Sequence, residues 1–63
     1  MGKVLLYLGE MDCIEDLIDR VGEDAAHKAW RGKLCYFKNV TDNQVFGVSD
    51  YEADYIFEKY EVY

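Results

Sequence analysis

The spacing of hydrophobic residues changes along this chain, and each change predicts a different secondary structure element. The run from Lys3 to Leu8 is apolar at almost every position and stops at Gly9, which is typical of a strand buried on both faces near the centre of a sheet. From Asp12 the apolar positions recur every three or four residues, which predicts a helix that ends at Gly22. Asp12 is a suitable N-cap, and Glu15 stands at the capping-box position. The expected apolar face comprises Cys13, Ile14, Leu17, Ile18 and Val21.

A second short helix is expected between Glu23 and Arg31, where three alanines and several basic residues precede Gly32. The pattern leaves open whether this helix is separate from the first or continues it after a kink. Trp30 is the only tryptophan of the chain. Its size predicts that it anchors the helix to the sheet, with the indole N–H near a polar partner.

The second half of the chain begins with alternating residues that predict two strands. Residues 33–40 place Leu34 and Tyr36 on one side and Cys35 and Phe37 on the other. The turn residues 41–43 and a second short strand over 44–48 complete a hairpin with a loop of three to five residues. Ser49 then repeats the capping-box pattern before a final helix. The apolar face of that helix comprises Ala53, Ile56, Phe57 and Tyr60.

These elements predict a single compact α+β domain over residues 1–63. The order is β-α(α)-β-β-α with a possible short C-terminal strand, and we expect a two-layer domain in which helices cover one face of a three- or four-stranded sheet. No proline, linker, repeat or low-complexity segment divides the chain. The predicted core residues are Leu17, Ile18, Trp30, Phe37, Ile56 and Phe57.

The composition supports a folded chain, because 51% of its 63 residues are hydrophobic and 16% are aromatic, in contrast to disordered chains. A domain of this size has a small core and little stability to spare. The apolar run from Val4 to Leu8 is too short to cross a membrane or to form the core of a signal peptide. We therefore expect a soluble, cytoplasmic protein.

The residue types that catalysis or metal binding requires are scarce. Cys13 and Cys35 are too few for a disulfide framework, and both occupy positions where the pattern favours an apolar side chain, so we expect two reduced core thiols. His27 is the only histidine and has no closely spaced cysteine pair with which to bind zinc. No signal places it in a cleft beside a nucleophile. We expect no enzyme activity, no metal and no cofactor.

Charge in this chain is both unbalanced and segregated. Thirteen Asp and Glu residues oppose seven Lys and Arg residues, for a net charge of −6. Residues 1–19 and 42–63 carry net charges of −4 and −5, whereas residues 20–41 carry +3. The basic segment interleaves Lys28, Arg31, Lys33 and Lys38 with aromatic residues that could stack on bases. The two acidic blocks oppose contact with phosphates, so we expect no direct binding of nucleic acid. We expect no membrane binding either.

The acidic residues fall on the polar faces of the first and last predicted helices, and we interpret these faces as the functional surface. Carboxylates four positions apart on a helix lie about 6 Å apart along its axis, comparable with successive phosphates on a strand. Tyr51 and Tyr55 are interleaved with the second acidic set, and tyrosine is favoured in protein interfaces. The predicted partner-binding residues are Asp12, Glu15, Asp16, Asp19, Asp50, Tyr51, Glu52, Asp54, Tyr55 and Glu58.

Small size, acidity, many tyrosines and the lack of catalytic motifs suggest a protein that acts by binding. In these respects the chain resembles the small early proteins of bacteriophages that block host enzymes, including anti-CRISPR, anti-restriction and polymerase-inhibiting proteins. The resemblance concerns size and charge, and it implies an inhibitor that occludes a basic, nucleic-acid-binding surface of a larger protein. The alternative is a small adaptor or subunit with a tyrosine-rich interface, in which charge serves only solubility. High salt weakens the first kind of contact and not the second.

Overall fold

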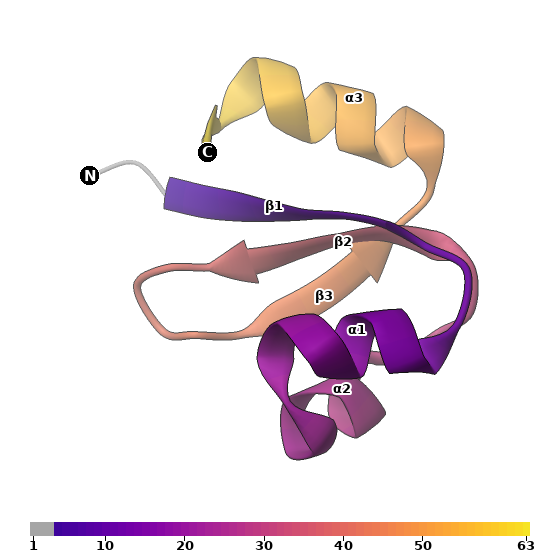
Figure 1. Ribbon diagram of the computed structural model, residues 1–63. Helices are drawn as coiled ribbons and strands as arrows, with labels where there is room; N and C mark the ends of the chain where they lie inside the picture. Colours follow the sequence, from indigo (N-terminus) through magenta and orange to yellow (C-terminus); the bar gives the residue numbers. More distant parts are fainter. Residues whose placement is uncertain (1–3) are drawn as a thin grey trace.

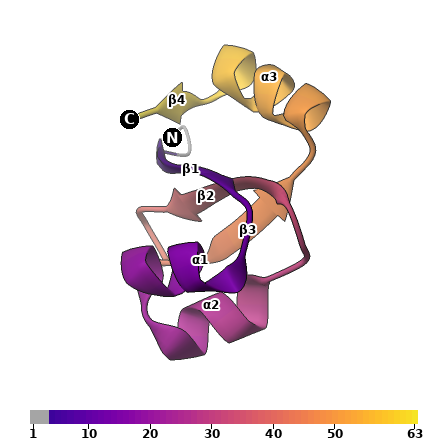
Figure 2. The ribbon, with the colours of Figure 1, turned by 45° about the vertical axis from the view of Figure 1, so that its right-hand side comes forward.

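The computed structural model describes residues 4–63, which form a four-stranded sheet with helices on both of its faces (Figure 1, Figure 2). The α+β class, the order of elements and the short C-terminal strand were predicted correctly. Lys3, the predicted start of the first strand, lies outside the described residues. The elements are β1 (Val4–Met11), α1 (Ile14–Val21), α2 (Glu23–Ala29), β2 (Leu34–Asn39), β3 (Val45–Val48), α3 (Asp50–Lys59) and β4 (Glu61–Val62).

The strands lie in the order β3-β2-β1-β4, so that β1 and β2 form the centre of the sheet. β2 runs antiparallel to both β1 and β3, and the predicted hairpin joins β2 to β3. Asn43 in the hairpin loop has a φ of 62°, a left-handed conformation that asparagine tolerates well. β4 pairs in parallel with the first residues of β1, and this pairing returns the end of the chain to the start of the first strand (Figure 1).

β1 continues through Gly9 to Met11 instead of ending at Leu8 as predicted. Its register with β2 slips between Tyr7 and Gly9, and Gly9 has a φ of 114° that a residue with a side chain rarely adopts. This bulge resets the alternation of side chains along the strand. Leu8 and Met11 therefore join the same hydrophobic cluster although they are three positions apart.

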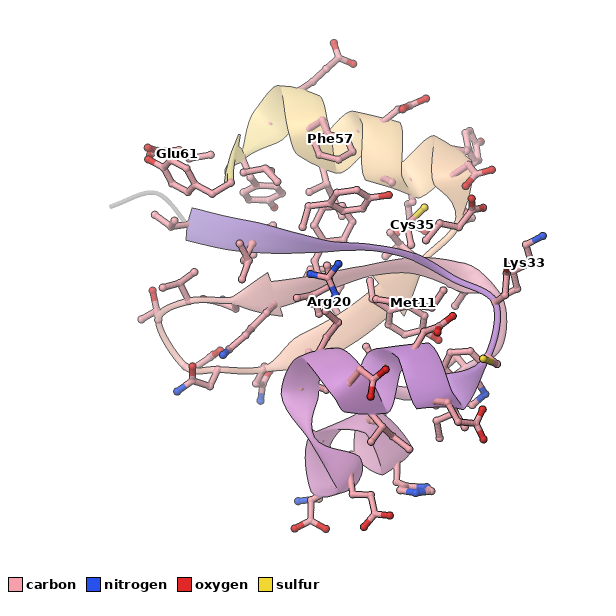
Figure 3. The ribbon with its side chains drawn as sticks, in the orientation of Figure 1. Met11, Arg20, Lys33, Cys35, Phe57 and Glu61 are labelled. Atoms are coloured by element: carbon pink, nitrogen blue, oxygen red, sulfur yellow. The ribbon has the colours of Figure 1, made fainter. Side chains whose placement is uncertain are left out.

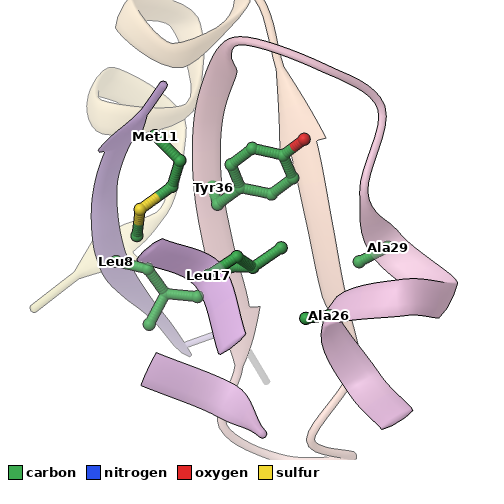
Figure 4. Close-up of a cluster of buried hydrophobic side chains, with 6 residues drawn as sticks. All are labelled: Leu8, Met11, Leu17, Ala26, Ala29 and Tyr36. Carbon is green, nitrogen blue, oxygen red and sulfur yellow. The ribbon is translucent and has the colours of Figure 1, made fainter. Parts of the chain in front are cut away.

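The sheet separates two hydrophobic clusters, and β2 contributes the largest fully buried side chain of each. Tyr36 and Phe37 are consecutive in sequence, so they point to opposite faces of the sheet, and both have an exposed fraction of 0%. The cluster beneath α1 and α2 contains Leu8, Met11, Leu17, Ala26, Ala29 and Tyr36 (Figure 4). The cluster beneath α3 contains Leu5, Cys35, Phe37, Ala53 and Ile56.

Helices therefore cover both faces of the sheet, and the expected placement on a single face was wrong in this respect. α1 and α2 lie on one side of the sheet and α3 lies on the other (Figure 1). Helical periodicity identifies the apolar side of each helix. It does not determine which face of the sheet that side covers, because both faces of β2 are apolar.

The Tyr36 side chain is held by the three consecutive residues that follow α2, residues 30–32. Its hydroxyl donates a hydrogen bond to the Gly32 carbonyl oxygen at 2.8 Å and accepts one from the Arg31 amide at 2.9 Å. The Trp30 ring stacks on the Tyr36 ring, with 5.5 Å between the centroids and 8° between the planes. Trp30 thus links the end of α2 to the sheet, but it is half-buried rather than a core residue.

The helix boundaries depart from the prediction at one cap. α1 begins at Ile14 with Cys13 as its N-cap residue, and no side chain caps this end, so the predicted capping box at Asp12 was wrong. Gly22, with a φ of 90°, ends α1 as predicted and separates it from α2. The Ser49 half of the second predicted capping box is confirmed, since the Ser49 hydroxyl accepts a hydrogen bond from the Glu52 amide at 3.4 Å.

Three of the predicted core residues are buried: Leu17, Phe37 and Ile56. Ile18 is half-buried against the first cluster. Phe57 has an exposed fraction of 45%, so its assignment to the core was wrong. α3 turns Ala53 and Ile56 toward the sheet, which leaves Phe57 on the side of the helix near β1.

Replacement of Leu17 by alanine tests the first cluster. The Leu17 side chain is fully buried, and deletion of such a side chain leaves a cavity that lowers the free energy of unfolding by about 2–5 kcal/mol. The measurement is urea denaturation followed by circular dichroism, with the exposed Asp19→Ala variant as the control on the same helix. An unchanged denaturation midpoint for Leu17→Ala would contradict the packing described here.

Gly47→Ala tests the contact between β3 and Tyr36. An alanine Cβ at this position would lie 2.5 Å from Tyr36 Cε1, well inside van der Waals contact. Such overpacking lowers the free energy of unfolding by about 1–3 kcal/mol. The same denaturation measurement in a Tyr36→Leu background provides the control, because the smaller side chain removes the overlap. Equal losses in both backgrounds would show that Tyr36 is not the cause.

Candidate functional site

The four predicted acidic residues near α1 are all exposed, at Asp12, Glu15, Asp16 and Asp19. Within α1, Glu15 and Asp19 lie on the side opposite the fully buried Leu17, and Asp16 lies on the flank of the helix. Asp12 precedes the helix, and one of its carboxylate oxygens lies 3.5 Å from Lys33 Nζ. Both side chains are exposed, so this ion pair adds little to stability. It does neutralise part of the negative charge at this end of α1.

The second acidic set lies on α3, where Asp50, Glu52, Asp54 and Glu58 are exposed. Asp50, Asp54 and Glu58 follow one another at intervals of four residues, which places them in a row along the helix. No carboxylate of α3 forms an ion pair with any residue in the range 4–63. The charge of Glu52, Asp54 and Glu58 is therefore available to a partner, whereas Asp50 accepts a hydrogen bond from the Cys35 thiol.

Tyrosines lie beside these carboxylates. The exposed fraction is 80% for Tyr51 and 56% for Tyr55. Lys59 Nζ lies 5.7 Å from the centroid of the Tyr55 ring, a cation–π contact on the side of α3 that faces away from Phe57. α3 therefore presents aromatic area and negative charge on one surface, which we call the α3 surface and define by Asp50, Tyr51, Glu52, Asp54, Tyr55 and Glu58.

The structure brings the residues of each acidic set together but keeps the two sets apart. α1 and α3 lie on opposite faces of the sheet, as both ribbon views show (Figure 1, Figure 2). A flat or shallow partner surface therefore contacts one set at a time. Sequence reasoning identified both faces but could not place them relative to each other, because nothing in the periodicity of either helix specifies a face of the sheet.

An aromatic group borders the α3 surface on the side of β1. Tyr7, Phe37 and Phe57 have ring centroids between 5.2 and 5.5 Å apart. Phe57 lies beside α3 and Cys35 lies on the same side of the sheet, whereas Met11 points toward α1 (Figure 3). Phe37 is buried, and the exposed parts of Tyr7 and Phe57 extend the apolar area beside the helix.

A groove lies on the other side of α3, between the helix and β3. Its volume is about 320 Å³. Leu5, Phe46, Val48 and Ile56 contribute apolar side chains to it, and Glu52 and Tyr55 line it from α3. Sequence reasoning missed this groove. The sequence feature that could have indicated it is the pair Phe46 and Val48. These two apolar side chains lie on one side of a short strand, and their combined area is larger than the small side chain of Ala53 can cover.

Cys35 is buried, as predicted, and its Sγ donates a hydrogen bond to Asp50 Oδ1 at 3.3 Å. Burial, followed by this hydrogen bond, raises the pKa of the Cys35 thiol. The thiol therefore stays protonated at neutral pH, whereas nucleophilic attack requires the thiolate. Burial likewise raises the pKa of the neighbouring Tyr7 hydroxyl.

Cys13 is exposed at the start of α1, so its assignment to the core was wrong. It fits the apolar periodicity, but it is the N-cap residue and its backbone is extended (φ −143°, ψ 161°), so its side chain does not follow the apolar face of the helix. Both thiols are free. His27 is exposed on α2. Within residues 4–63, no group of three or more His, Cys, Asp or Glu side chains is arranged to bind a metal ion.

Comparison of the chain with protein-family models, curated proteins and solved structures finds no match in any of the three. None of the three helices in residues 4–63 combines the length and apolar composition that a bilayer crossing requires.

The different burial of the two thiols predicts different reactivity. Under native conditions iodoacetamide should modify Cys13 and leave Cys35 largely unmodified, because Cys35 is shielded by the sheet and α3 and stays protonated. In denaturant both thiols should react, and mass spectrometry of peptide fragments would locate the adducts. A Cys13→Ser variant, which should show almost no native labelling, is the control. Equal labelling rates, or a disulfide between the two cysteines, would contradict the described burial.

Proposed function

We propose that this chain is a small acidic inhibitor that uses the α3 surface to occlude a basic, nucleic-acid-binding surface of a larger protein. The observation that carries the proposal is the exposed row Asp50, Asp54 and Glu58, whose carboxylates have no ion-pair partner in residues 4–63. Asp50 accepts a hydrogen bond from Cys35, so Asp54 and Glu58 are the members most available to a partner. Successive members of the row are separated by about 6 Å along the helix. A pocket that accommodates successive phosphates fits such a row.

The chemistry of the α3 surface also suits a stable contact rather than a transient encounter. Charge complementarity chiefly accelerates association and selects partners. Affinity depends more on aromatic residues that become buried in the interface, and Tyr51 and Tyr55 are exposed aromatic residues of this kind. The α3 surface supplies both, whereas the α1 face lacks exposed aromatic residues and has part of its charge paired with Lys33. We therefore assign the contact to α3 and regard the α1 face as an extension of the negative field.

The proposal places the chain in the cytoplasm, as a phage-type anti-defence or host-takeover protein such as an anti-CRISPR. Free thiols suit a reducing compartment. The class of partner that the proposal implies is a nucleic-acid-binding protein with a basic surface. No catalytic step is involved, because occlusion of the cleft suffices for inhibition.

The test uses two matched double variants that change the charge equally on opposite faces. Asp54→Lys with Glu58→Lys alters the α3 surface, and Asp16→Lys with Asp19→Lys alters α1. Each protein, carrying an affinity tag, captures proteins from a bacterial lysate at low and high salt, and mass spectrometry identifies them. Circular dichroism checks the fold, which exposed charges affect little.

We expect wild type and the α1 variant to capture the same nucleic-acid-binding protein, and added DNA or RNA to displace it. The α3 variant should lose this capture, and high salt should weaken it for wild type. Capture that survives in the folded α3 variant, or that nucleic acid does not displace, would refute the proposal.

The exposure of Tyr51 and Tyr55 favours a second possible function, that of an adaptor or subunit. In this case the partner contacts the tyrosines, and the chain does not compete with nucleic acid for the partner. This function predicts capture that is insensitive to salt and to charge reversal on α3. Tyr51→Ser with Tyr55→Ser would then abolish capture. The same series of pull-down measurements thus separates the two functions.

A further inference from the structure

The hydrogen-bond directions along β2 show which backbone groups of its neighbour β3 are unpaired. The Asn39 amide donates to the Gln44 carbonyl oxygen at 2.8 Å, on the side of β3. The Val40 amide donates to the Val4 carbonyl oxygen at 3.1 Å, on the side of β1. Because these directions alternate along an antiparallel strand, odd-numbered residues of β2 turn toward β3 and even-numbered residues turn toward β1.

This alternation determines which backbone N–H and C=O groups are unpaired at the outer edge of β3. Val45 lies opposite Lys38 and Gly47 lies opposite Tyr36, and both of these β2 residues turn toward β1. The N–H and C=O groups of Val45 and Gly47 therefore point away from β2. β3 is the last strand of the sheet, and no strand among residues 4–63 covers this side. An edge of this kind is a template for an additional strand.

The groove beside α3 borders this edge. Phe46 and Val48 of β3 are half-buried and contribute to the groove together with Leu5 and Ile56. A strand added to β3 would lie about 4.8 Å from it and would place every second side chain on the α3 face of the sheet. One such side chain, if apolar, would enter the groove beside Phe46. Main-chain pairing combined with a pocket for alternate side chains is a known mode of peptide recognition.

Charge at the groove selects the rest of the bound segment. Glu52 lines the groove near the end at which β3 passes into α3. Its carboxylate forms no ion pair with any residue in the described part of the chain. A lysine or arginine located two positions from the apolar side chain would lie on the same face of the sheet and reach this carboxylate.

We infer that the outer edge of β3 and the groove beside α3 bind an extended segment of a partner protein by strand addition. In that segment an apolar residue occupies the groove and a lysine or arginine two positions away pairs with Glu52. The inference rests on the proposed function, since it specifies how the basic partner engages the α3 side of the molecule.

A second copy of this chain is a poor occupant of the same edge. Antiparallel pairing of two β3 strands would make one continuous sheet and would bring both copies of α3 to the same face. Each copy has a net charge of −6, and each α3 carries four carboxylates against Lys59. Repulsion between the helices opposes this dimer, whereas a basic segment is attracted.

The probe is a synthetic blocked peptide of sequence TKTLTKT, titrated into the isotopically labelled protein and followed by NMR. Its leucine lies two positions from a lysine in either direction, so both strand orientations are tested. We expect shifts at the Val45 and Gly47 amides and at the groove methyl groups of Leu5, Val48 and Ile56. Replacement of the leucine by serine, or of both lysines by glutamate, should abolish these shifts.

Two controls examine the two parts of the site separately. Two versions of the peptide are N-methylated at alternate nitrogens, and only the version that blocks pairing with β3 should lose binding. Glu52→Lys should weaken binding by about fivefold. Glu15→Lys, the same change in the first turn of α1 on the opposite face, should leave binding unchanged.

Three results would overturn the inference. They are shifts confined to α1, equal binding of both methylated peptides, and protection of the Val45 and Gly47 amides that rises with protein concentration in the absence of peptide. The last result would identify a second copy as the occupant. These outcomes are distinct from failure of the proposed function, which is tested by charge reversal at Asp54 and Glu58 on the solvent side of α3. If wild type captures a nucleic-acid-binding protein that the Asp54 and Glu58 variant does not capture, while the peptide fails to bind, only the present inference fails.

Discussion

The burial of two consecutive aromatic side chains on β2 is the constraint on which the rest of this domain depends. Tyr36 and Phe37 point to opposite faces of one strand, and neither has any exposed surface. One face is covered by α1 and α2, and the other by α3. Since a chain of 63 residues has a small core, a single helical layer would leave one of these aromatic rings in contact with water.

Most elements could be predicted from the sequence, because their signals are local. The alternation in β2, Gly22 as the end of α1 and Ser49 as the cap of α3 all act within a few residues. Apart from the N-cap predicted at Asp12, which is a local error, the errors concern long-range geometry. Phe57 has the periodicity of a core residue but lies on the side of α3, since the position of the helix over the sheet is set by the small residue Ala53. The bulge at Gly9 likewise depends on pairing with β2.

In the candidate site, too, the features with a local signal could be predicted and those that depend on long-range geometry could not. The exposure of both acidic sets followed from helical periodicity, whereas their location on opposite faces required the tertiary structure. The groove beside α3 is formed by residues from β1, β3 and α3, which no local pattern connects. Electrostatics contributes little to the fold itself, because the ion pair recorded in residues 4–63 joins two exposed side chains. The stability of the fold therefore places little constraint on the charged residues of these faces, and they can be used for binding.

The separation of the two clusters by the sheet has a consequence for the dynamics of the chain. Proteins open in cooperative units whose free energies lie below that of global unfolding. Here α3 packs on one face of the sheet and β4 pairs with β1 at an edge, so we expect these two elements to open while α1 and α2 remain packed around Tyr36. Such a partially open state would expose Phe37 and the thiol of Cys35 to solvent without dismantling the hairpin. We expect such opening to involve the helix to which we assign binding, so that local opening and binding would concern the same surface.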